Sequence, residues 1–375
     1  MALPLSYIEI SKANLQHNIR SVKKLLPNGV KVAASIKANA YGHGQNEVAK
    51  ILNKEVDYFQ VNSIEELREL RKVTKKSVLF LGYVTKEHIS EAIDLGCEMA
   101  VFSLQHIIDI DKVAGKINKL VKVHVSIDSS LGREGILPQE TAVFLHSISK
   151  LKNVKPVGVY AHFANIEDTV NLAHARKQMK GYEEALKQFD KFGYKKLQRH
   201  ISATSGVMAL NGNGVFDLVR IGIGLYGMWP SENLKKEHIK KFALKPVMRW
   251  VTHVSLVKWL PKDHTIGYGL TYRTSKETKT ALVPQGYADG YDRAFSNKGE
   301  VLIKGKRCKV LGRVSMNMFV VDVTHLKDVK VEDEVVLLGR QGGEEITAEE
   351  MGDLIGTINY EITTRVSTLL ARIIK

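Results

Sequence analysis

The sequence predicts an α/β barrel followed by a β domain, and three observations support this fold class. Short β-branched runs alternate with segments of helical apolar spacing through the first two-thirds of the chain. Near residue 240 this pattern gives way to strand-like runs separated by turn residues. The 375 residues also fit a barrel of about 250 residues plus a smaller partner. We therefore expect a (β/α)8 barrel over residues 1–240 and a C-terminal β domain over residues 241–375.

Eight apolar runs are the candidate barrel strands. Runs that are apolar throughout are typical of parallel strands with helices on both faces. Between them, residues 64–73 form a helical pattern after Ser63, with Glu66 at the spacing of a capping box, and residues 172–192 are amphipathic. The candidate strands are residues 30–36, 57–62, 77–82, 97–103, 120–127, 156–163, 200–203 and 217–224.

The C-terminal part has the pattern of a β meander with one short helix. Lys304 and Gly305 form a hairpin turn within the strand-like residues 301–323, and Thr347 begins a helix over residues 347–357. The first ten residues, with the strand-like SYIEIS beginning at Ser6, can belong to either domain.

Composition excludes several classes of protein. Hydrophobic residues make up 44% and charged residues 25%, as in ordinary globular proteins. No apolar run is long enough for a membrane span, and the N-terminus lacks the pattern of a secretory signal. Cys97 and Cys308 have no metal-ligand spacing, so we expect two buried thiols, no metal site and a reducing, cytoplasmic location.

The net charge of +15 raises the alternative of a non-catalytic nucleic-acid-binding protein. Lysines form small clusters at residues 72–76, 234–241 and 304–309, and none is interleaved with aromatic residues as in a single-strand binding face. We expect scattered surface lysines and no nucleic-acid partner.

Residues suited to chemistry follow the candidate strands, where the active sites of barrels form. A lysine held there loses solvation, which lowers its pKa and makes it nucleophilic. Taken alone, Lys37 fits better with a solvated lysine on the rim of the barrel. The residues at strand ends are Lys37, Tyr41, Arg133, His162, Thr204, Ser205, Arg220 and Gly222.

Residues 222–227 read GIGLYG, which matches the glycine pattern of dinucleotide-binding folds. That pattern belongs at a first strand, whereas here it follows the eighth. A loop whose N–H groups bind a phosphate fits better, because barrel phosphate sites lie after strands seven and eight. The hydroxyls of Thr204 and Ser205 precede it. In the β domain, Tyr268 and Tyr287 lie in glycine-rich turns, where packing or hydrogen bonding is an alternative to chemistry.

At this point the motifs carry a resemblance to a family. SIKANAYGHG (35–44) resembles the lysine motif of the alanine racemases, which bind pyridoxal 5′-phosphate (PLP). The likeness runs from residue 6 to about residue 372. The other similar blocks, in the family's order, are DSSLGREGI (128–136), YAHFAN (160–165), LVRIGIGLYG (218–227), GYGLTY (267–272), GYADGYDR (286–293), GRVSMN (312–317) and GTINYE (356–361).

The resemblance implies a PLP-binding barrel, a C-terminal β domain and a head-to-tail homodimer. It implies interconversion of L-alanine and D-alanine in the cytoplasm, supplying D-alanine for peptidoglycan. A broad-specificity amino-acid racemase of the same fold is the alternative. A fold-related PLP decarboxylase is disfavoured, because Arg220 rather than an acidic residue would face the cofactor ring.

The resemblance also implies residue roles. Lys37 would carry the cofactor and act as one base, and Tyr268 from the partner subunit would be the other. One base on each face of Cα is the simplest arrangement for racemisation, and an arginine at the pyridine nitrogen leaves the ring a weaker electron sink. The implied cofactor contacts are Tyr41, Arg133, His162, Thr204 or Ser205, Arg220, Gly222, Ile223 and Tyr360, and the implied substrate contacts are Arg133, Tyr287 and Met316.

Three positions depart from the family pattern. Ser126 stands where many members have a lysine modified to a carbamate that orients the arginine matching Arg133. Either a bound anion, water or another side chain replaces it, or Arg133 is less well fixed. Asn317 stands where an aspartate is usual, which puts charge at the substrate entrance in doubt, and residues 369–372 match poorly.

Overall fold

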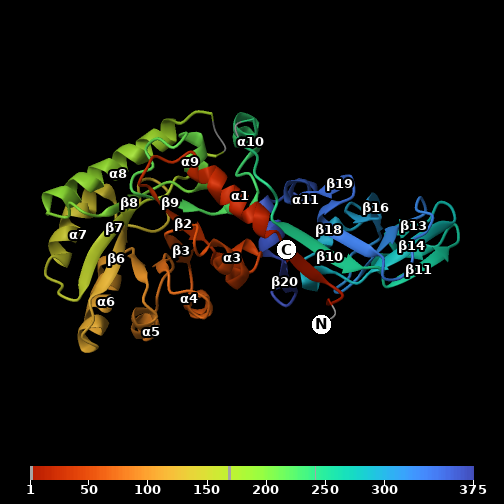
Figure 1. Cartoon of the computed structure of the whole chain (residues 1–375), viewed down its shortest axis with the longest axis horizontal. Helices are drawn as coiled ribbons and strands as arrows, with labels where there is room; N and C mark the ends of the chain where they lie inside the picture. Colours follow the sequence, from red (N-terminus) through yellow and green to blue (C-terminus); the bar gives the residue numbers. More distant parts are fainter. Residues whose placement is uncertain (1–2, 168–169, 241) are drawn as a thin grey trace. The chain divides into compact units, whose positions relative to one another are not determined.

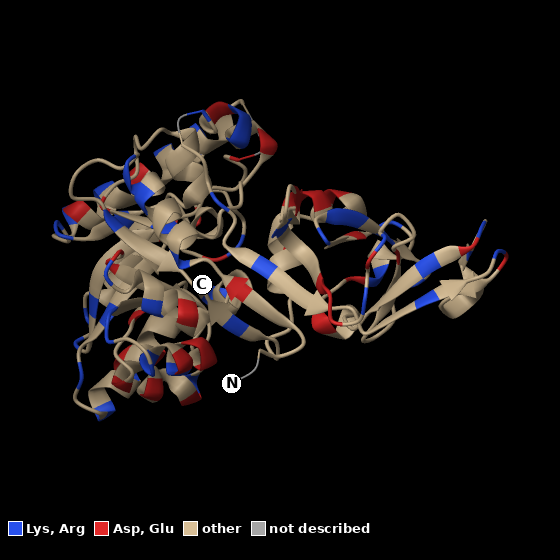
Figure 2. Cartoon of the chain, turned by 45° about the vertical axis from the view of Figure 1, so that its right-hand side comes forward, with Lys and Arg blue, Asp and Glu red and all other residues tan. Residues whose placement is uncertain are grey.

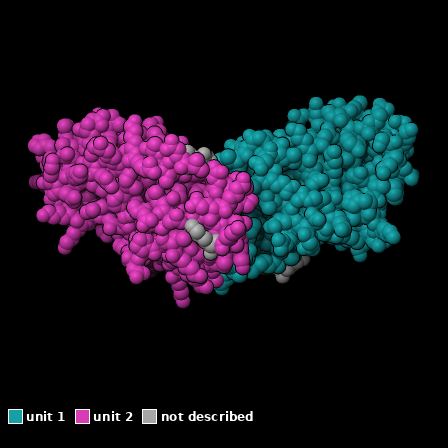
Figure 3. All heavy atoms as spheres, turned by 90° about the horizontal axis from the view of Figure 1, so that it is seen from above, with its two compact units in different colours: residues 1–14, 39–47, 246–375 teal, residues 15–38, 48–245 magenta. Residues whose placement is uncertain are grey.

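The computed structural model describes residues 3–167, 170–240 and 242–375 (Figure 1). Contacts divide the chain into two compact units, coloured separately in Figure 3. The barrel unit comprises residues 15–38 and 48–245, and the β unit comprises residues 1–14, 39–47 and 246–375. The domain boundary expected near residue 240 stays a prediction.

The barrel unit contains eight parallel strands in the order β8-β7-β6-β5-β4-β3-β2-β9. The two outer strands approach through a bridge between Ala203 and Arg220, so the barrel is nearly closed. Each strand overlaps one of the predicted apolar runs, which confirms the barrel fold. The strands are β2 (Lys31–Ser35), β3 (Tyr58–Val61), β4 (Ser77–Phe80), β5 (Glu98–Val101), β6 (Val121–Ser126), β7 (Val154–Tyr160), β8 (Gln198–His200) and β9 (Leu218–Ile221).

Helices α3 to α9 lie between successive barrel strands along the chain, α1 precedes β2 and α10 follows β9. Figure 1 shows α4 to α8 outside the strands. The Ser63 side chain accepts a hydrogen bond from the Glu66 N–H, which confirms the predicted cap of α4. The helices are α1 (Lys12–Lys23), α3 (Gln45–Leu52), α4 (Ile64–Arg71), α5 (Ile89–Asp94), α6 (Leu104–Lys116), α7 (Thr141–Ile148), α8 (Ala173–Lys191), α9 (Thr204–Ala209) and α10 (Glu232–His238).

The β unit is built on a sheet in the order β11-β14-β17-β16-β15-β18-β10-β1-β20. β1 (Tyr7–Ile10) pairs with β10 (Met248–His253) and β20 (Ala371–Ile374), so the strand-like N-terminus belongs to this unit. The other strands are β11 (Leu256–Leu260), β12 (Thr265–Ile266), β13 (Tyr272–Arg273), β14 (Thr278–Val283), β15 (Glu300–Ile303), β16 (Lys306–Leu311), β17 (Phe319–Asp322), β18 (Glu334–Gln341) and β19 (Glu344–Ile346).

Local expectations for the β unit hold, with one addition. β15 and β16 form the hairpin predicted at Lys304 and Gly305, both at positive φ. The Thr347 side chain accepts from the Glu350 N–H and caps α11 (Ala348–Ile355). A second helix, α12 (Asn359–Thr364), follows directly and was not predicted.

Both cysteines are buried and free, as expected. Figure 2 shows basic and acidic segments interspersed along the ribbon of both units. None of the helices in the described parts of the chain has the length and apolarity needed to cross a membrane.

Candidate active site

The predicted site residues of the barrel unit lie at the carboxyl ends of its strands. This placement follows from the parallel topology, because all strands point the same way. Lys37 follows β2, Arg133 lies in the segment after β6, His162 follows β7, Thr204 and Ser205 begin α9 after β8, Arg220 lies in β9, and Gly222 and Ile223 follow it.

Lys37 lies on a strained piece of backbone. The four residues Ala38 to Tyr41 all have φ between 51° and 54°, so α2 (Lys37–Tyr41) is a left-handed turn. Such a turn costs about 1–2 kcal/mol per non-glycine residue. Glu66 accepts the N–H of Ala38 at 2.6 Å at the start of this turn. Strain held in place by surrounding contacts is typical of functional sites.

Burial lowers the pKa of the Lys37 amine, and the nearby charges of Arg133 and Arg220 lower it further. Glu66 and Glu134 act in the opposite direction but do not reverse the shift. A larger share of the amine is therefore neutral at working pH, as a base or nucleophile requires.

Arg220 is buried, and its two terminal nitrogens are fully used within the barrel. NH1 donates to His200 Nδ1 at 2.5 Å and to the His200 carbonyl, and NH2 donates to the carbonyls of Ala161 and Ile201 and to His162 Nδ1 at 3.2 Å. Burial lowers the pKa of Arg220 to about 10, which still leaves it charged at neutral pH. Its Nε–H has no hydrogen-bond partner among the described residues. That group is the donor left for a ligand.

His162 is neutral in this environment. Burial and the charge of Arg220 lower its pKa to about 3. Because the guanidinium can only donate, His162 Nδ1 must accept, and the ring proton resides on Nε2.

Thr204 joins two glycine N–H groups into a small polar cluster. Its hydroxyl accepts from Gly222 N at 3.2 Å and Gly224 N at 3.4 Å. A Cβ on Gly224 would lie 2.7 Å from the Thr204 methyl group, so only glycine allows this approach. Ser205 is half-buried beside it.

Arg133 is paired with the next residue in the chain. Glu134 accepts from both Nε and NH2 of Arg133 in a bidentate ion pair, with an NH2–Oε1 distance of 2.9 Å. Ser126 is buried, and its hydroxyl donates to the Glu134 carbonyl at 3.4 Å. A carboxylate therefore already contacts the arginine in a chain that has serine at position 126.

The remaining predicted residues belong to the β unit. The rings of Tyr41 and Tyr360 lie 6.1 Å apart. Arg372, which the sequence did not single out, donates through NH2 to the Gly42 carbonyl at 2.8 Å. A Cβ on Gly42 would lie 1.9 Å from the Thr363 carbonyl oxygen, so the turn after Tyr41 packs directly on α12.

Tyr268 begins the short helix η4 (Tyr268–Leu270) and is 74% exposed. Gly267 and Gly269 on either side have φ of 74° and 70°, which confirms the predicted glycine-flanked turn. A Cβ on Gly269 would lie 2.7 Å from the guanidinium of Arg313. The turn thus holds the tyrosine away from its own unit's core.

Tyr287 and Met316 are neighbours in the β unit. Tyr287 N donates to the Ser315 carbonyl at 3.2 Å, and Ala288 N donates to the Met316 carbonyl at 2.9 Å. This approach requires glycine at position 286, because a Cβ added there would lie 2.4 Å from the Met316 carbonyl oxygen.

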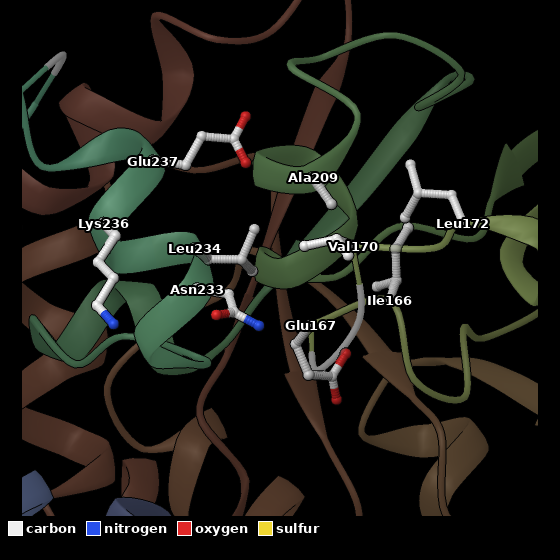
Figure 4. A pocket seen from close by; sticks show the side chains of 9 residues that line it. All are labelled: Ile166, Glu167, Val170, Leu172, Ala209, Asn233, Leu234, Lys236 and Glu237. Carbon is white, nitrogen blue, oxygen red and sulfur yellow. The ribbon is translucent and has the colours of Figure 1, made fainter.

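Predicted site residues therefore fall into two groups, one in each unit. Within the barrel unit, Arg220 contacts His162, and Thr204 contacts Gly222; within the β unit, Tyr41 lies near Tyr360. A separate cavity of about 460 Å³ in the barrel unit contains none of them (Figure 4). Apolar side chains such as Ile166 and Leu234 and charged ones such as Lys236 line it.

Comparison with known proteins identifies the family. Residues 10–230 match the model of the alanine racemase N-terminal domain, and residues 247–374 match the model of its C-terminal domain. The alanine racemase of Carboxydothermus hydrogenoformans is 38% identical, covering 98% of each chain. Alanine racemase 2 of Caldanaerobacter subterraneus is 36% identical, covering 98% of this chain and 94% of that one.

Solved structures agree with this assignment. The alanine racemase of Clostridium difficile 630 superposes with a TM-score of 0.93 at 34% identity, covering 100% of this chain and 97% of that one. The Bacillus anthracis alanine racemase with bound L-Ala-P has a TM-score of 0.93 at 32% identity, and the match covers 100% of this chain and 96% of that one. With both domain models matched over nearly its whole length, the chain belongs to the alanine racemase family.

Proposed function

We propose that this protein is a PLP-dependent racemase that interconverts L-alanine and D-alanine. The observation that carries the proposal is Lys37, a partly buried amine with a lowered pKa at the mouth of a barrel of this family. The product D-alanine would serve peptidoglycan synthesis in the cytoplasm. A broad-specificity racemase of the same fold is the second candidate.

The barrel unit has groups that fit PLP. A phosphate needs several donors, and the hydroxyl protons of Thr204 and Ser205 and the N–H of Ile223 offer them. The N–H of Gly222 donates to the Thr204 hydroxyl and would have to turn from it to reach a phosphate. A pyridine nitrogen needs one donor, and the unpartnered Nε–H of Arg220 supplies it. Tyr41 and Tyr360 of the β unit are the further phosphate contacts that the family resemblance implies.

When bound, PLP withdraws electrons from Cα of an amino acid and makes its proton removable. Lys37 holds the cofactor through its side-chain amine and moves a proton at one face of Cα. Tyr268 of a second subunit moves a proton at the other face. Its 74% exposure in the single chain suits a residue that acts in a partner's site.

Arg133 binds the substrate carboxylate and the phenolic oxygen of the cofactor in this proposal. A guanidinium matches a carboxylate through paired N–H groups. Tyr287 and the backbone at Met316, from the partner subunit, complete the carboxylate site. Both residues are exposed in the single chain, which agrees with a homodimer that shares its active sites.

The direct test is conversion of L-alanine by the purified protein loaded with PLP. We expect D-alanine to accumulate until the two enantiomers are equal, as measured by chiral chromatography. A panel of other L-amino acids distinguishes the candidates, since a broad racemase would convert several at comparable kcat/KM. Absence of turnover on the whole panel would contradict both.

Replacing Arg220 should alter reaction specificity. Arg220 keeps its proton at neutral pH and so leaves the pyridine nitrogen unprotonated. In Arg220→Glu, a carboxylate would favour a protonated pyridine ring. Such a ring is a stronger electron sink, which would lengthen the lifetime of the deprotonated substrate. We expect slower racemisation and pyruvate formation by transamination, measured by chromatography. Because a buried ion is replaced, thermal unfolding and a neutral Arg220→Gln variant serve as controls. If no pyruvate accumulates from folded Arg220→Glu, the neutral-ring argument is wrong.

Glu134 should matter for substrate binding, because it holds the Arg133 guanidinium from one side. In Glu134→Gln the ion pair loses its charge and one acceptor, and a charge-assisted hydrogen bond of this kind contributes about 1.5–3 kcal/mol. Part of this is lost to solvent, since the Arg133 side chain is 62% exposed. We expect KM for alanine to rise about 3- to 10-fold. The exposed Glu140→Gln serves as the matched control, and an unchanged KM in Glu134→Gln would show that Arg133 is positioned by other groups.

A further inference from the structure

A continuous chain of hydrogen bonds crosses the interior of the barrel and ends on Arg220. Glu98 Oε2 lies 2.9 Å from His124 Nε2, and His124 Nδ1 lies 2.9 Å from His200 Nε2. His200 Nδ1 then lies 2.5 Å from Arg220 NH1. Both histidines are fully buried, and the Glu98 side chain is 13% exposed. Glu98 begins β5, so the chain starts at the end of the barrel opposite to Lys37.

The two ends of this chain dictate the proton positions along it. A guanidinium only donates, so His200 Nδ1 must accept, and neutral His200 carries its proton on Nε2. That proton is donated to His124 Nδ1, which places the His124 proton on Nε2. The Glu98 carboxylate, which only accepts when ionised, receives it. No other assignment of two neutral rings satisfies every hydrogen bond in the chain.

The fold makes specific room for this chain. His124 is on β6 and His200 is on β8, so β7 lies between them in the sheet. The β7 residue in register with His124 is Gly158. A Cβ at Gly158 would lie 2.0 Å from His124 Nδ1, so any side chain there would displace the ring. The two imidazoles can meet across β7 only because this position is glycine.

The surroundings keep both ends charged and the rings oriented. Hydrogen bonding to His124 lowers the pKa of Glu98 despite its burial, and the Lys122 amine lies 3.7 Å from the carboxylate. The ring of Tyr160 stacks on the ring of His200, with a centroid distance of 5.2 Å and an interplanar angle of 11°. The Arg220 guanidinium lies over the Tyr160 ring, 5.4 Å from its centroid. Glu98 and Arg220 are therefore opposite charges joined by two neutral donors.

We propose that Glu98 is a positioning residue for the reaction at Arg220. Through His124 and His200 it fixes which nitrogen of each imidazole accepts, which holds the guanidinium in one orientation with Nε–H available to a ligand. Glu98 contacts neither cofactor nor substrate. The link to the reaction rests on the proposed racemase function, but the proton positions are a property of the protein alone.

The first test measures those proton positions without cofactor. The protein is labelled with ¹⁵N-histidine, and the ring nitrogens of His124 and His200 are assigned by NMR. We expect both rings to be neutral with the proton on Nε2 near neutral pH. A protonated Nδ1 on either ring would overturn the proposal. This readout does not depend on racemase activity, so it stands even if the proposed function fails.

The second test compares Glu98→Gln with Glu98→Leu. Glutamine can still accept from His124, so the tautomers should persist and kcat should fall less than about fivefold. Leucine removes the acceptor, so we expect mixed His124 tautomers and a loss in kcat of about 10- to 100-fold with little change in KM, as for other supporting residues behind a site. The exposed Glu65→Leu is the matched control.

The outcomes separate a positioning role from a merely structural one. The proposal would be overturned if folded Glu98→Leu kept the kcat of the parent protein, or if kcat fell equally in the glutamine and leucine variants. If Glu98→Leu does not fold, the tautomers of the parent protein and of Glu98→Gln still test the proposal. Loss of the Nε2–H tautomers in the glutamine variant would contradict the proposed hydrogen-bond chain. If the parent protein shows the expected tautomers but no racemase activity, the proposed function is contradicted, whereas the proposed hydrogen-bond chain from Glu98 to Arg220 is not.

Discussion

Lys37→Ala should abolish racemisation in both directions. Under the proposed function, the substitution removes both the amine that would hold the cofactor and the base at one face of Cα. A positioned base alone contributes about 10²–10⁴-fold, so we expect a loss of at least about 10⁴-fold once the covalent link is lost as well. Chiral chromatography from L-alanine and from D-alanine measures it. Turnover retained in either direction would refute the role of Lys37.

Two controls make this result specific to the amine. The exposed Lys54→Ala should keep parent activity, which excludes a general effect of lost positive charge. Borohydride treatment of the parent with PLP should fix the cofactor to the peptide containing Lys37, as found by mass spectrometry. Label on another lysine would overturn the assignment, whatever the activity of the variant.

The local reason for the choice of Lys37 is its environment rather than its residue type. Burial and two arginines lower its pKa, whereas a lysine exposed on the rim would stay charged. As pH rises through this lowered pKa, the amine loses its proton and becomes a base. The base-dependent limb of kcat/KM should therefore lie at lower pH than the ordinary lysine pKa of about 10.4.

Local pattern was enough to predict the barrel. Its strands are apolar on both faces, and such runs stand out from amphipathic helices even in a single sequence. Caps at Ser63 and Thr347 were predictable for the same reason, because a cap depends on residues three apart. Placement of Lys37 and Arg220 at strand ends then follows from parallel topology alone.

Other features have no local signal in the sequence. The left-handed run Ala38–Tyr41 is imposed on residues that prefer right-handed backbone, so propensity argues against it. Arg372 holds the Gly42 carbonyl from 330 residues away in the chain. The contact of His124 with His200 depends on a glycine in a third strand. Each is decided by tertiary packing, which a pattern along the chain does not contain.

The family motif also left open what stands near Arg133 when position 126 is serine. The structure places the Glu134 carboxylate there, one residue along the chain. The sequence contains this glutamate in GREGI, but adjacency does not predict an ion pair, because neighbouring side chains in a strand point to opposite faces. Only the loop conformation after β6 brings the two groups together.

Tyr268→Phe should slow racemisation equally from both enantiomers yet affect proton exchange unequally. L-alanine and D-alanine have the same free energy in water, so kcat/KM must fall by one factor in both directions. Exchange of the Cα proton with solvent is not bound by this rule. The enantiomer whose proton faces Lys37 should still exchange in D₂O, whereas exchange of the other should slow about 10²–10⁴-fold. ¹H NMR measures both rates, and Tyr272→Phe is the matched control. Small and equal losses in the exchange rates of the two enantiomers would contradict a two-base scheme.

The subunit that supplies Tyr268 can be identified by mixing two inactive variants. If Lys37 and Tyr268 act in the same site from different subunits, a dimer of one Lys37→Ala chain and one Tyr268→Phe chain contains one site with both bases intact. Its second site lacks both. Such mixed dimers, purified with two affinity tags, should therefore regain about half the parent activity per dimer, by this site count. If both bases came from one chain, each site would lack one of them and no activity would return. Recovery thus tests the homodimer, the shared site and the two-base assignment in one measurement, because it requires all three.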